Sequence, residues 1–170
     1  MAKTGFKKGD IIVYPLHGVG NILKIEKSKV SGEMLVYYNI KMYNTEMSVR
    51  IPVGKDIDIG IRKITNRKNI SKMYNSLRRL PKNIEKDWKK RFQNNTDKLK
   101  EGSIDSISEV VKELYLRNHV KALSIMEKKQ YENALNLLLD EVAISSRTEK
   151  ADVKKTILKF LANLLNKYTK

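Results

Sequence analysis

A β-strand pattern followed at once by a turn signal lies near the start of the chain, in Asp10-Ile11-Ile12-Val13-Tyr14-Pro15-Leu16-His17-Gly18. Its β-favouring apolar residues predict a short strand, and the proline and glycine that follow interrupt regular structure. Further β-rich runs and turn signals follow at 19–26, Ser31-Gly32, 34–42, Asn44-Thr45 and 47–51. Four or five strands in under 60 residues predict a small curled sheet or open barrel. Gly18 and Gly20 are the residues expected to permit its bend or bulge.

After Ile64 the apolar spacing changes from that of strands to that of helices. Pro81 and Gly102 end the first two runs, Ser103 is a candidate N-cap, and Ser124 with Glu127 forms a capping-box pattern. The sequence therefore predicts an α+β protein with a β domain at residues 1–64 and a domain of five helices at 65–170. The apolar positions expected inside the helices include Ile70, Met73, Leu77, Ile84, Trp88, Phe92, Leu99, Val111, Leu114, Leu138, Ile157 and Leu161.

Composition limits the classes of protein to consider. The chain has 170 residues, of which 41% are hydrophobic and none is Cys, so it can bury a core but has no disulfides or thiol nucleophiles. The absence of a long apolar run predicts no membrane partner, and we expect a cytoplasmic monomer. The net charge of +16 favours a polyanionic partner, although 27 of the 35 basic residues are Lys, a bias that an AT-rich genome also produces.

The distribution of charge is more informative than its total. Residues 65–100 carry 12 basic and 3 acidic side chains, which is more than half of the excess in 36 residues. This clustering indicates a localised binding face for nucleic acid.

The sequence contains no convincing catalytic or metal-binding constellation. His17 and His119 are the only histidines and fall in different predicted domains. Asp56 and Asp58 lie on one side of a strand-like segment, where a solvated loop is a better interpretation than a cation site. We therefore expect no enzyme activity, no cofactor and no metal.

The densest basic run, Lys82 to Arg91, surrounds the only tryptophan, Trp88. Its cations can neutralise phosphates, and an indole can stack on a base or open a base step. The spacing of Ile84, Trp88 and Phe92 by four residues, taken alone, favours Trp88 as a core residue. Arg78 and Arg79 either extend the cationic surface or cap a helix C-terminus.

The ordered motifs over residues 6–146 resemble the CarD/CdnL family of bacterial transcription regulators. They are Phe6 through Pro15, His17-Gly18, Val49-Arg50-Ile51-Pro52, Ile59-Gly60-Ile61-Arg62, Trp88-Lys89-Lys90-Arg91-Phe92, Lys98-Leu99, Glu109 through Leu114, Leu123-Ser124 and Glu127-Lys128. The first domain is also similar to the polymerase-interacting domain of transcription-repair coupling factors, but this chain has no room for motor domains.

The resemblance implies a Tudor-like (SH3-like) open barrel that binds the RNA polymerase β subunit and a helical domain that binds promoter DNA at the upstream edge of the bubble. It implies that Trp88 is a minor-groove wedge that stabilises the open complex, which reverses the preference for a core position. Lys90 and Lys128 match phosphate-contacting positions, and Arg50 matches a polymerase contact. Gln93 and Ser28 replace basic residues of the family, and Lys89, Arg91, Lys27 and Lys29 are candidates to compensate.

Two other functions remain open from the sequence. One is a polymerase-independent, sequence-nonspecific double-stranded DNA-binding protein of the nucleoid type. The other is a protein-binding adaptor whose basic face meets an acidic partner while Trp88 is buried.

Overall fold

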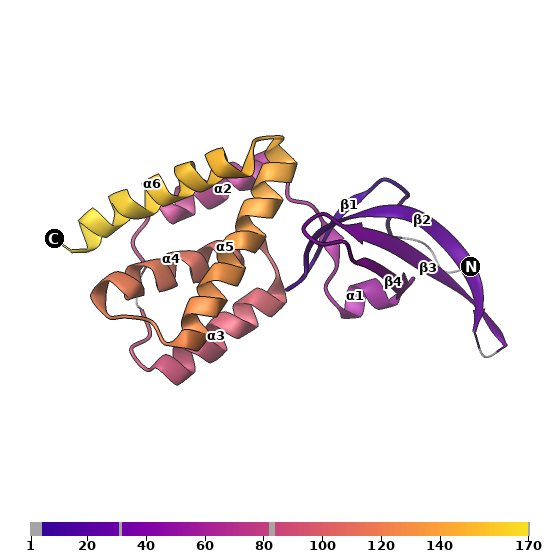
Figure 1. Cartoon of the computed structure of the whole chain (residues 1–170), viewed down its shortest axis with the longest axis horizontal. Helices are drawn as coiled ribbons and strands as arrows, with labels where there is room; N and C mark the ends of the chain where they lie inside the picture. Colours follow the sequence, from indigo (N-terminus) through magenta and orange to yellow (C-terminus); the bar gives the residue numbers. More distant parts are fainter. Residues whose placement is uncertain (1–4, 31, 82–83, 170) are drawn as a thin grey trace. The chain divides into compact units, whose positions relative to one another are not determined.

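The structure is a computed structural model that describes residues 5–30, 32–81 and 84–169. The chain divides into two compact units, of which the first ends at Ile64 and the second begins at Thr65. The first unit is built on β-strands and the second is helical (Figure 1). The predicted α+β class, with an N-terminal sheet and five C-terminal helices, is confirmed. The predicted turn residue Ser31 and the start of the basic run at Lys82 lie outside the described residues.

The first unit is a five-stranded antiparallel sheet in the order β4-β3-β2-β1-β5. Its strands are β1 (Ile11–Tyr14), β2 (Gly18–Val30), β3 (Glu33–Met42), β4 (Ser48–Pro52) and β5 (Arg62–Lys63). Strands β4 and β5 form the two edges of the sheet and pair with one neighbour each in the described residues, so the sheet is open. Its core contains Phe6, Ile12, Ile22, Tyr38, Ile40, Met42, Ile51 and Ile61.

Gly20 is required by the close approach of β3. A Cβ atom at this position would lie 2.6 Å from Cγ2 of Ile40, so a larger residue would force the strands to shift. The irregularity in strand pairing lies farther along β2, between Ile22 and Lys24. Gly18 and Gly20 therefore do not form this bulge, and their role in a bend of the sheet stays a prediction; Gly18 has the positive φ that glycine tolerates.

The predicted strand-like segment around Asp56 is instead α1 (Lys55–Asp58), a single helical turn. The buried carboxylate of Asp56 accepts a hydrogen bond from the Gly54 backbone N–H at 2.7 Å. Asp58 points to solvent and pairs with Lys55 at 3.3 Å. The two carboxylates therefore have separate local roles and do not form a cation site.

The second unit contains α2 (Arg67–Leu77), α3 (Trp88–Glu101), α4 (Ile104–Val120), α5 (Ile125–Ser146) and α6 (Lys150–Tyr168). Local capping sets several of the starts: the side chains of Asn66, Asp87, Ser103 and Ser124 each accept a backbone hydrogen bond from the first turn of the helix that follows. The cap at Ser103 and the capping box of Ser124 with Glu127 are confirmed.

Helix α4 is the centre of the helical unit, because it packs against α2, α3, α5 and α6. In Figure 1, α3 and the pair α2 and α6 lie on opposite sides of α4. The shared core includes Met73, Leu77, Leu99, Val111, Leu114, Leu138, Ile157 and Leu161. Full burial of side chains of this size contributes about 1.5–3 kcal/mol each, so the core fixes where each helix presents its polar face. No helix in the described parts of the chain has the length and apolar character needed to cross a membrane.

Candidate nucleic-acid interface

Trp88 is the first residue of α3, and its side chain is 48% exposed. The helix begins there because Oδ1 of Asp87 accepts hydrogen bonds from the backbone N–H groups of Lys89 and Lys90, at 2.8 and 3.2 Å. Bonds from Lys90 and Lys89 hold the pKa of the Asp87 carboxyl below its usual value. The core position that spacing alone favours for Trp88 is therefore wrong, because Ile84 precedes the helix and does not share a helical face with Trp88.

Two exposed cations follow the indole directly. Lys89 and Lys90 both point to solvent on the first turn of α3. The Nζ atom of Lys89 lies 5.9 Å from the centroid of the Trp88 ring, at the limit of a cation–π contact. The beginning of α3 therefore presents an aromatic surface flanked by positive charge.

Arg91 does not belong to this surface, which corrects its prediction as a DNA contact. Only 2% of the residue is exposed, because it lies on the inward stripe of α3 with Asn95 and Leu99. Its Nε and Nη2 atoms donate to Oε1 of Glu127, at 2.8 and 2.5 Å. Its Nη1 atom donates to the carbonyl oxygen of Glu85 at 2.6 Å. The guanidinium therefore fastens the segment before Trp88 to α5.

Glu127 connects this ion pair to the start of α5. Its other oxygen, Oε2, accepts bonds from the backbone N–H and the hydroxyl of Ser124, at 3.2 and 3.0 Å. Burial raises the pKa of Glu127, but the hydrogen bonds from Arg91 and Ser124 outweigh burial and leave that pKa below its ordinary value. The neighbouring Lys128 points to solvent. The ion pair thus brings Lys128 to the same end of the helical unit as Trp88, where the beginnings of α3 and α5 meet in Figure 1.

Glu113 of α4 lies near the segment before Trp88, and the pKa of its carboxyl is affected by Arg91 and by the Glu85 backbone. Arg91 binds the carbonyl oxygen of Glu85. Burial raises the pKa of Glu113, against the opposing effect of Lys98 and Arg91. Arg91 of α3, itself bound by Glu127 of α5, therefore fixes the peptide of Glu85, three residues before the indole.

Arg78 and Arg79 are exposed, but the structure does not group them with Trp88. The Arg78 guanidinium lies 4.2 Å above the ring centroid of Phe160 in α6. Arg79 lines a cavity of about 560 Å³ with residues that include Lys98 and Lys112. Lys98 is ten residues beyond Trp88, or about 15 Å along α3 at the helical rise. The two arginines therefore belong to other parts of the helical unit.

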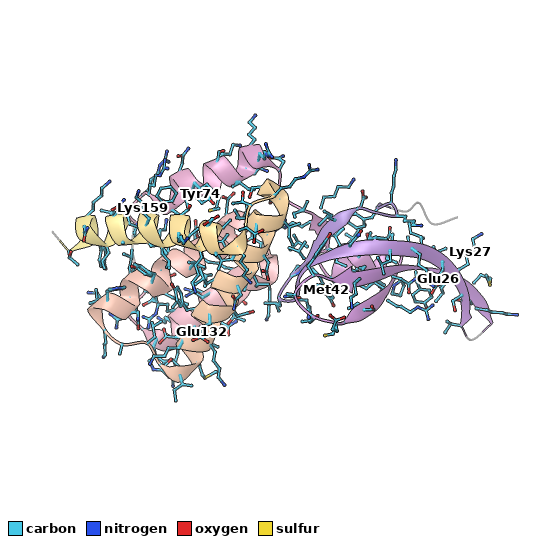
Figure 2. The ribbon with its side chains drawn as sticks, turned by 45° about the horizontal axis from the view of Figure 1, so that its top comes forward. Glu26, Lys27, Met42, Tyr74, Glu132 and Lys159 are labelled. Atoms are coloured by element: carbon cyan, nitrogen blue, oxygen red, sulfur yellow. The ribbon has the colours of Figure 1, made fainter. Side chains whose placement is uncertain are left out.

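In the first unit, the predicted polymerase contacts lie on β2 and β4. Arg50 pairs with Glu26 at 3.3 Å, and its guanidinium lies 4.8 Å from the ring centroid of Tyr37. Lys27 and Lys29 are exposed on the outer half of β2, where Figure 2 labels Glu26 and Lys27. Side chains alternate between the faces of a strand, so Ser28 points to the face opposite both lysines. Lys27 and Lys29 therefore do not supply positive charge on the face of the strand where Ser28 lies.

The position of Gln93 is different. Its Nε2 atom donates to Oδ1 of Asp97 at 3.0 Å. Lys89 and Lys90 lie four and three residues before it, and therefore share its side of α3. Gln93 stands where the family pattern has a basic residue. Lys89 and Lys90 lie on the same face of α3 as Gln93, so their positive charge is on the side where that basic residue would be.

The two histidine rings contact residues close to them in the chain. The ring of His17 lies 4.3 Å from that of Tyr14, and Nδ1 of His119 lies 2.9 Å from the carbonyl oxygen of Tyr115. Within the described residues, no group of three or more His, Asp or Glu side chains is placed to hold a metal ion.

Sequence reasoning missed the joint between Arg91 and Glu127. The capping box around Glu127 is readable because it spans four residues, but its ion pair joins positions 36 residues apart. An arginine inside a basic run carries no local signal that it is buried.

Comparisons with known proteins cover both units. Residues 6–65 match the CarD-like/TRCF RID domain, and residues 72–158 match the CarD C-terminal domain. The chain is 40% identical over 152 residues to "Putative transcription factor YdeB" of Bacillus subtilis (strain 168), an alignment that covers 85% of this chain and 95% of that protein. These matches confirm the resemblance seen in the sequence, because two family domains follow each other in order and the alignment covers nearly all of the relative. They also agree with the prediction of a transcription regulator that is not an enzyme. The chain belongs to the CarD-like family of transcription factors.

Proposed function

We propose that this chain binds RNA polymerase through its first unit and stabilises the open promoter complex by placing Trp88 at the upstream edge of the DNA bubble. The observation that carries the proposal is the exposure of the indole on the first turn of α3, beside Lys89 and Lys90. A large aromatic side chain on a cationic surface suits the junction of double-stranded and single-stranded DNA. There, an open base step offers a stacking surface and two backbones offer phosphates.

Wedging favours open DNA because the site for the indole exists only when the base step has opened. Stacking of an aromatic ring on a base contributes about 1–3 kcal/mol. A contribution of about 1.4 kcal/mol that acts on bubble collapse alone changes the lifetime of the bubble about tenfold. A modest contact is therefore sufficient for regulation.

The cations around the indole add attraction that does not depend on sequence. Lys89, Lys90 and Lys128 are exposed around the beginnings of α3 and α5, whose dipoles also place positive potential there. Asp87 offsets part of the dipole of α3 because its carboxylate caps the helix. The lysine side chains are therefore expected to supply most of the phosphate attraction, and sequence preference should follow the deformability of the base step.

Polymerase binding by the first unit is supported by its match to the CarD-like/TRCF RID domain. Arg50, Lys27 and Lys29 are the side chains that we assign to that contact. Tethering to polymerase raises the local concentration of the helical unit near the promoter, so its own affinity for DNA can be weak.

The deciding experiment measures the decay of open complexes after a heparin challenge, with wild-type protein and with Trp88→Ala. A shorter lifetime with unchanged polymerase binding supports the wedge, and equal decay rates would remove it. If the protein has the same affinity for duplex DNA with and without polymerase at physiological salt, and does not change the lifetime of open complexes, it acts as a nucleoid-type DNA-binding protein instead.

A further inference from the structure

A second cationic surface lies on α2 and α6, away from Trp88. Residues 65–80, which include α2, carry five basic and no acidic side chains. Helix α6 carries five lysines and one acidic residue, Asp152. By comparison, α3 carries five basic and two acidic side chains, and the charge of its Arg91 is neutralised by Glu127. More of the exposed positive charge of the helical unit therefore lies on α2 and α6 than on α3.

Three of the five lysines of α6 are arranged on one flank of the helix. Its buried stripe consists of Val153, Ile157, Leu161 and Leu164. At about 100° per residue, Lys155, Lys159 and Lys167 fall on the flank beyond Phe160, away from this stripe. The three lysines are exposed, and from Lys155 to Lys167 they extend about 18 Å along the helix.

Helix α2 continues the same surface. Its buried residues are Ile70, Met73 and Leu77, and Lys68 and Lys72 project from the opposite side. The ring of Tyr74 meets that of Phe160 in a T-shaped contact with centroids 5.5 Å apart, which joins the two helices. Figure 2 labels Tyr74 and Lys159 on these neighbouring helices. We define the α2–α6 face by Arg67, Lys68, Lys72, Lys155, Lys159 and Lys167.

The seam between the two helices contains a hollow suited to a phosphate group. It has a volume of about 170 Å³ and is lined by Arg78, Phe160, Asn163, Leu164 and Lys167. Arg78 is held over Phe160 by stacking, while Lys167 and Asn163 add further hydrogen-bond donors. No carboxylate is among these lining residues, so the hollow offers positive charge without internal neutralisation.

We infer that the α2–α6 face binds the phosphate backbone of a segment of double-stranded DNA, separate from the segment at Trp88. This inference goes beyond the proposed function because it requires neither polymerase nor the wedge. Cations spread along two adjacent helices match a partner whose negative charge repeats along its length. Helix α4 lies between this face and α3, so the two surfaces address different segments of DNA (Figure 1).

The surface is a poor match for a membrane or an apolar protein partner. Helices that lie on membranes expose large apolar side chains beside their lysines. On α6 the apolar residues Val153, Ile157, Leu161 and Leu164 are buried, and Tyr168 at the end of the helix is its only exposed large hydrophobic residue among those described. A polar, cationic surface without an apolar centre is typical of nonspecific contacts with duplex DNA.

The experiment compares the full chain with three triple variants that all lower the net charge from +16 to +10. They are Lys155→Glu/Lys159→Glu/Lys167→Glu on the α2–α6 face, Lys89→Glu/Lys90→Glu/Lys128→Glu around Trp88, and Lys7→Glu/Lys8→Glu/Lys55→Glu in the first unit as a control. All nine lysines are exposed. Thermal melts followed by circular dichroism verify that each variant folds.

The first readout is the salt dependence of binding to a short blunt duplex, followed by fluorescence anisotropy. Each phosphate contact adds about 0.9 to the slope of log affinity against log salt. The α2–α6 variant should lower that slope by about 2–3 relative to the control variant. A slope equal to that of the control would overturn the inference.

The second readout is capture of a labelled duplex by protein already bound to an immobilised duplex. Wild-type protein should capture it, and the α2–α6 variant should not; absence of capture by wild-type protein would also overturn the inference.

Trp88 fluorescence with forked DNA separates the two proposals, because the α2–α6 variant should keep the wild-type response. If the fluorescence of wild-type Trp88 does not respond to forked DNA while the α2–α6 variant loses duplex binding, the proposed wedge role of Trp88 is wrong and the inference that the α2–α6 face binds DNA is supported. Loss of binding to phosphatidylglycerol vesicles with unchanged duplex binding would assign the face to membranes instead.

Discussion

Arg91 and Glu127 form a buried ion pair in which the Nε and Nη2 atoms of the arginine both bind Oε1 of the glutamate. The remaining groups of the pair are also used, since Nη1 binds the Glu85 carbonyl and Oε2 closes the capping box of α5. The joint links the segment before Trp88, the body of α3 and the first turn of α5.

Arg91→Met should destabilise the helical unit by about 3–5 kcal/mol, because it leaves the Glu127 carboxylate buried without its partner. Urea unfolding followed by circular dichroism measures the loss. Combining it with Glu127→Gln should recover part of the stability, since the amide is neutral. Lys155→Met is the matched control: its ion pair with Asp152 at 3.4 Å is exposed, so the loss should stay below about 1 kcal/mol. Equal losses for the two single variants would contradict the structural role of Arg91.

Stability should fall in acid partly through Glu127. Its pKa in the folded chain lies below the ordinary value of 4.5, so its contribution is complete above that value and is lost as the pH falls through the folded pKa. Urea midpoints measured from about pH 7 down to about pH 3 for wild type and Glu127→Gln test this. The variant should be less stable near neutrality, and the difference should shrink in acid. A difference that is constant with pH would contradict the expectation.

Trp88→Ala should shorten the lifetime of open complexes about tenfold if the indole contributes about 1.4 kcal/mol against bubble collapse. The heparin challenge described above measures the lifetime. Val120→Ala is the control, because it removes another exposed apolar side chain of the helical unit, 58% exposed, at the end of α4. The control should decay at the wild-type rate, and both proteins should bind polymerase normally.

Charge reversal around the indole should weaken binding to forked DNA and reduce its salt dependence. Lys89→Glu/Lys90→Glu/Lys128→Glu removes three exposed cations and leaves the buried Arg91 intact. The slope of log affinity against log salt should fall by about 2–3. Gel shifts over a range of salt concentrations measure it, and a wild-type slope would place the DNA contact of the wedge elsewhere.

Arg50→Glu should weaken retention of the chain by the polymerase β subunit in a pull-down. The change reverses an exposed charge on β4 and also places it beside Glu26, its present partner. Lys55→Glu in α1 is the control, since it reverses another exposed charge of the same unit. Equal retention of both variants would remove Arg50 from the proposed contact. A fragment of residues 1–64, which form a separate compact unit, should itself be retained.

Features set by neighbouring residues were predictable from the sequence. The capping box at Ser124 spans four positions, and the strand at 11–14 is bounded by a proline and glycine. The bulge in β2 was not predictable, because register depends on how the whole β2–β3 pair meets, and it falls at Leu23 and not at a glycine. Local signals thus located the elements but not the details of their pairing.

The candidate site was predictable only in part. Family motifs identified Trp88, whereas residue spacing alone placed it in the core because it extended the helix back to Ile84. The cap at Asp87 excludes that extension, although an aspartate before a basic run was visible as a possible cap. The burial of Arg91 depends on Glu127, and no spacing rule connects residues so far apart in the chain.

The hydrogen bond from Arg91 to the Glu85 carbonyl, with Arg91 itself bound by Glu127 of α5, has a consequence for how the indole would meet DNA. The backbone that carries the indole is ordered when the helical unit folds, so the entropic cost of ordering it is not added to the free energy of DNA binding. Such preorganisation predicts that loosening the anchor would slow capture of a fraying base pair even while the ring itself remained unchanged.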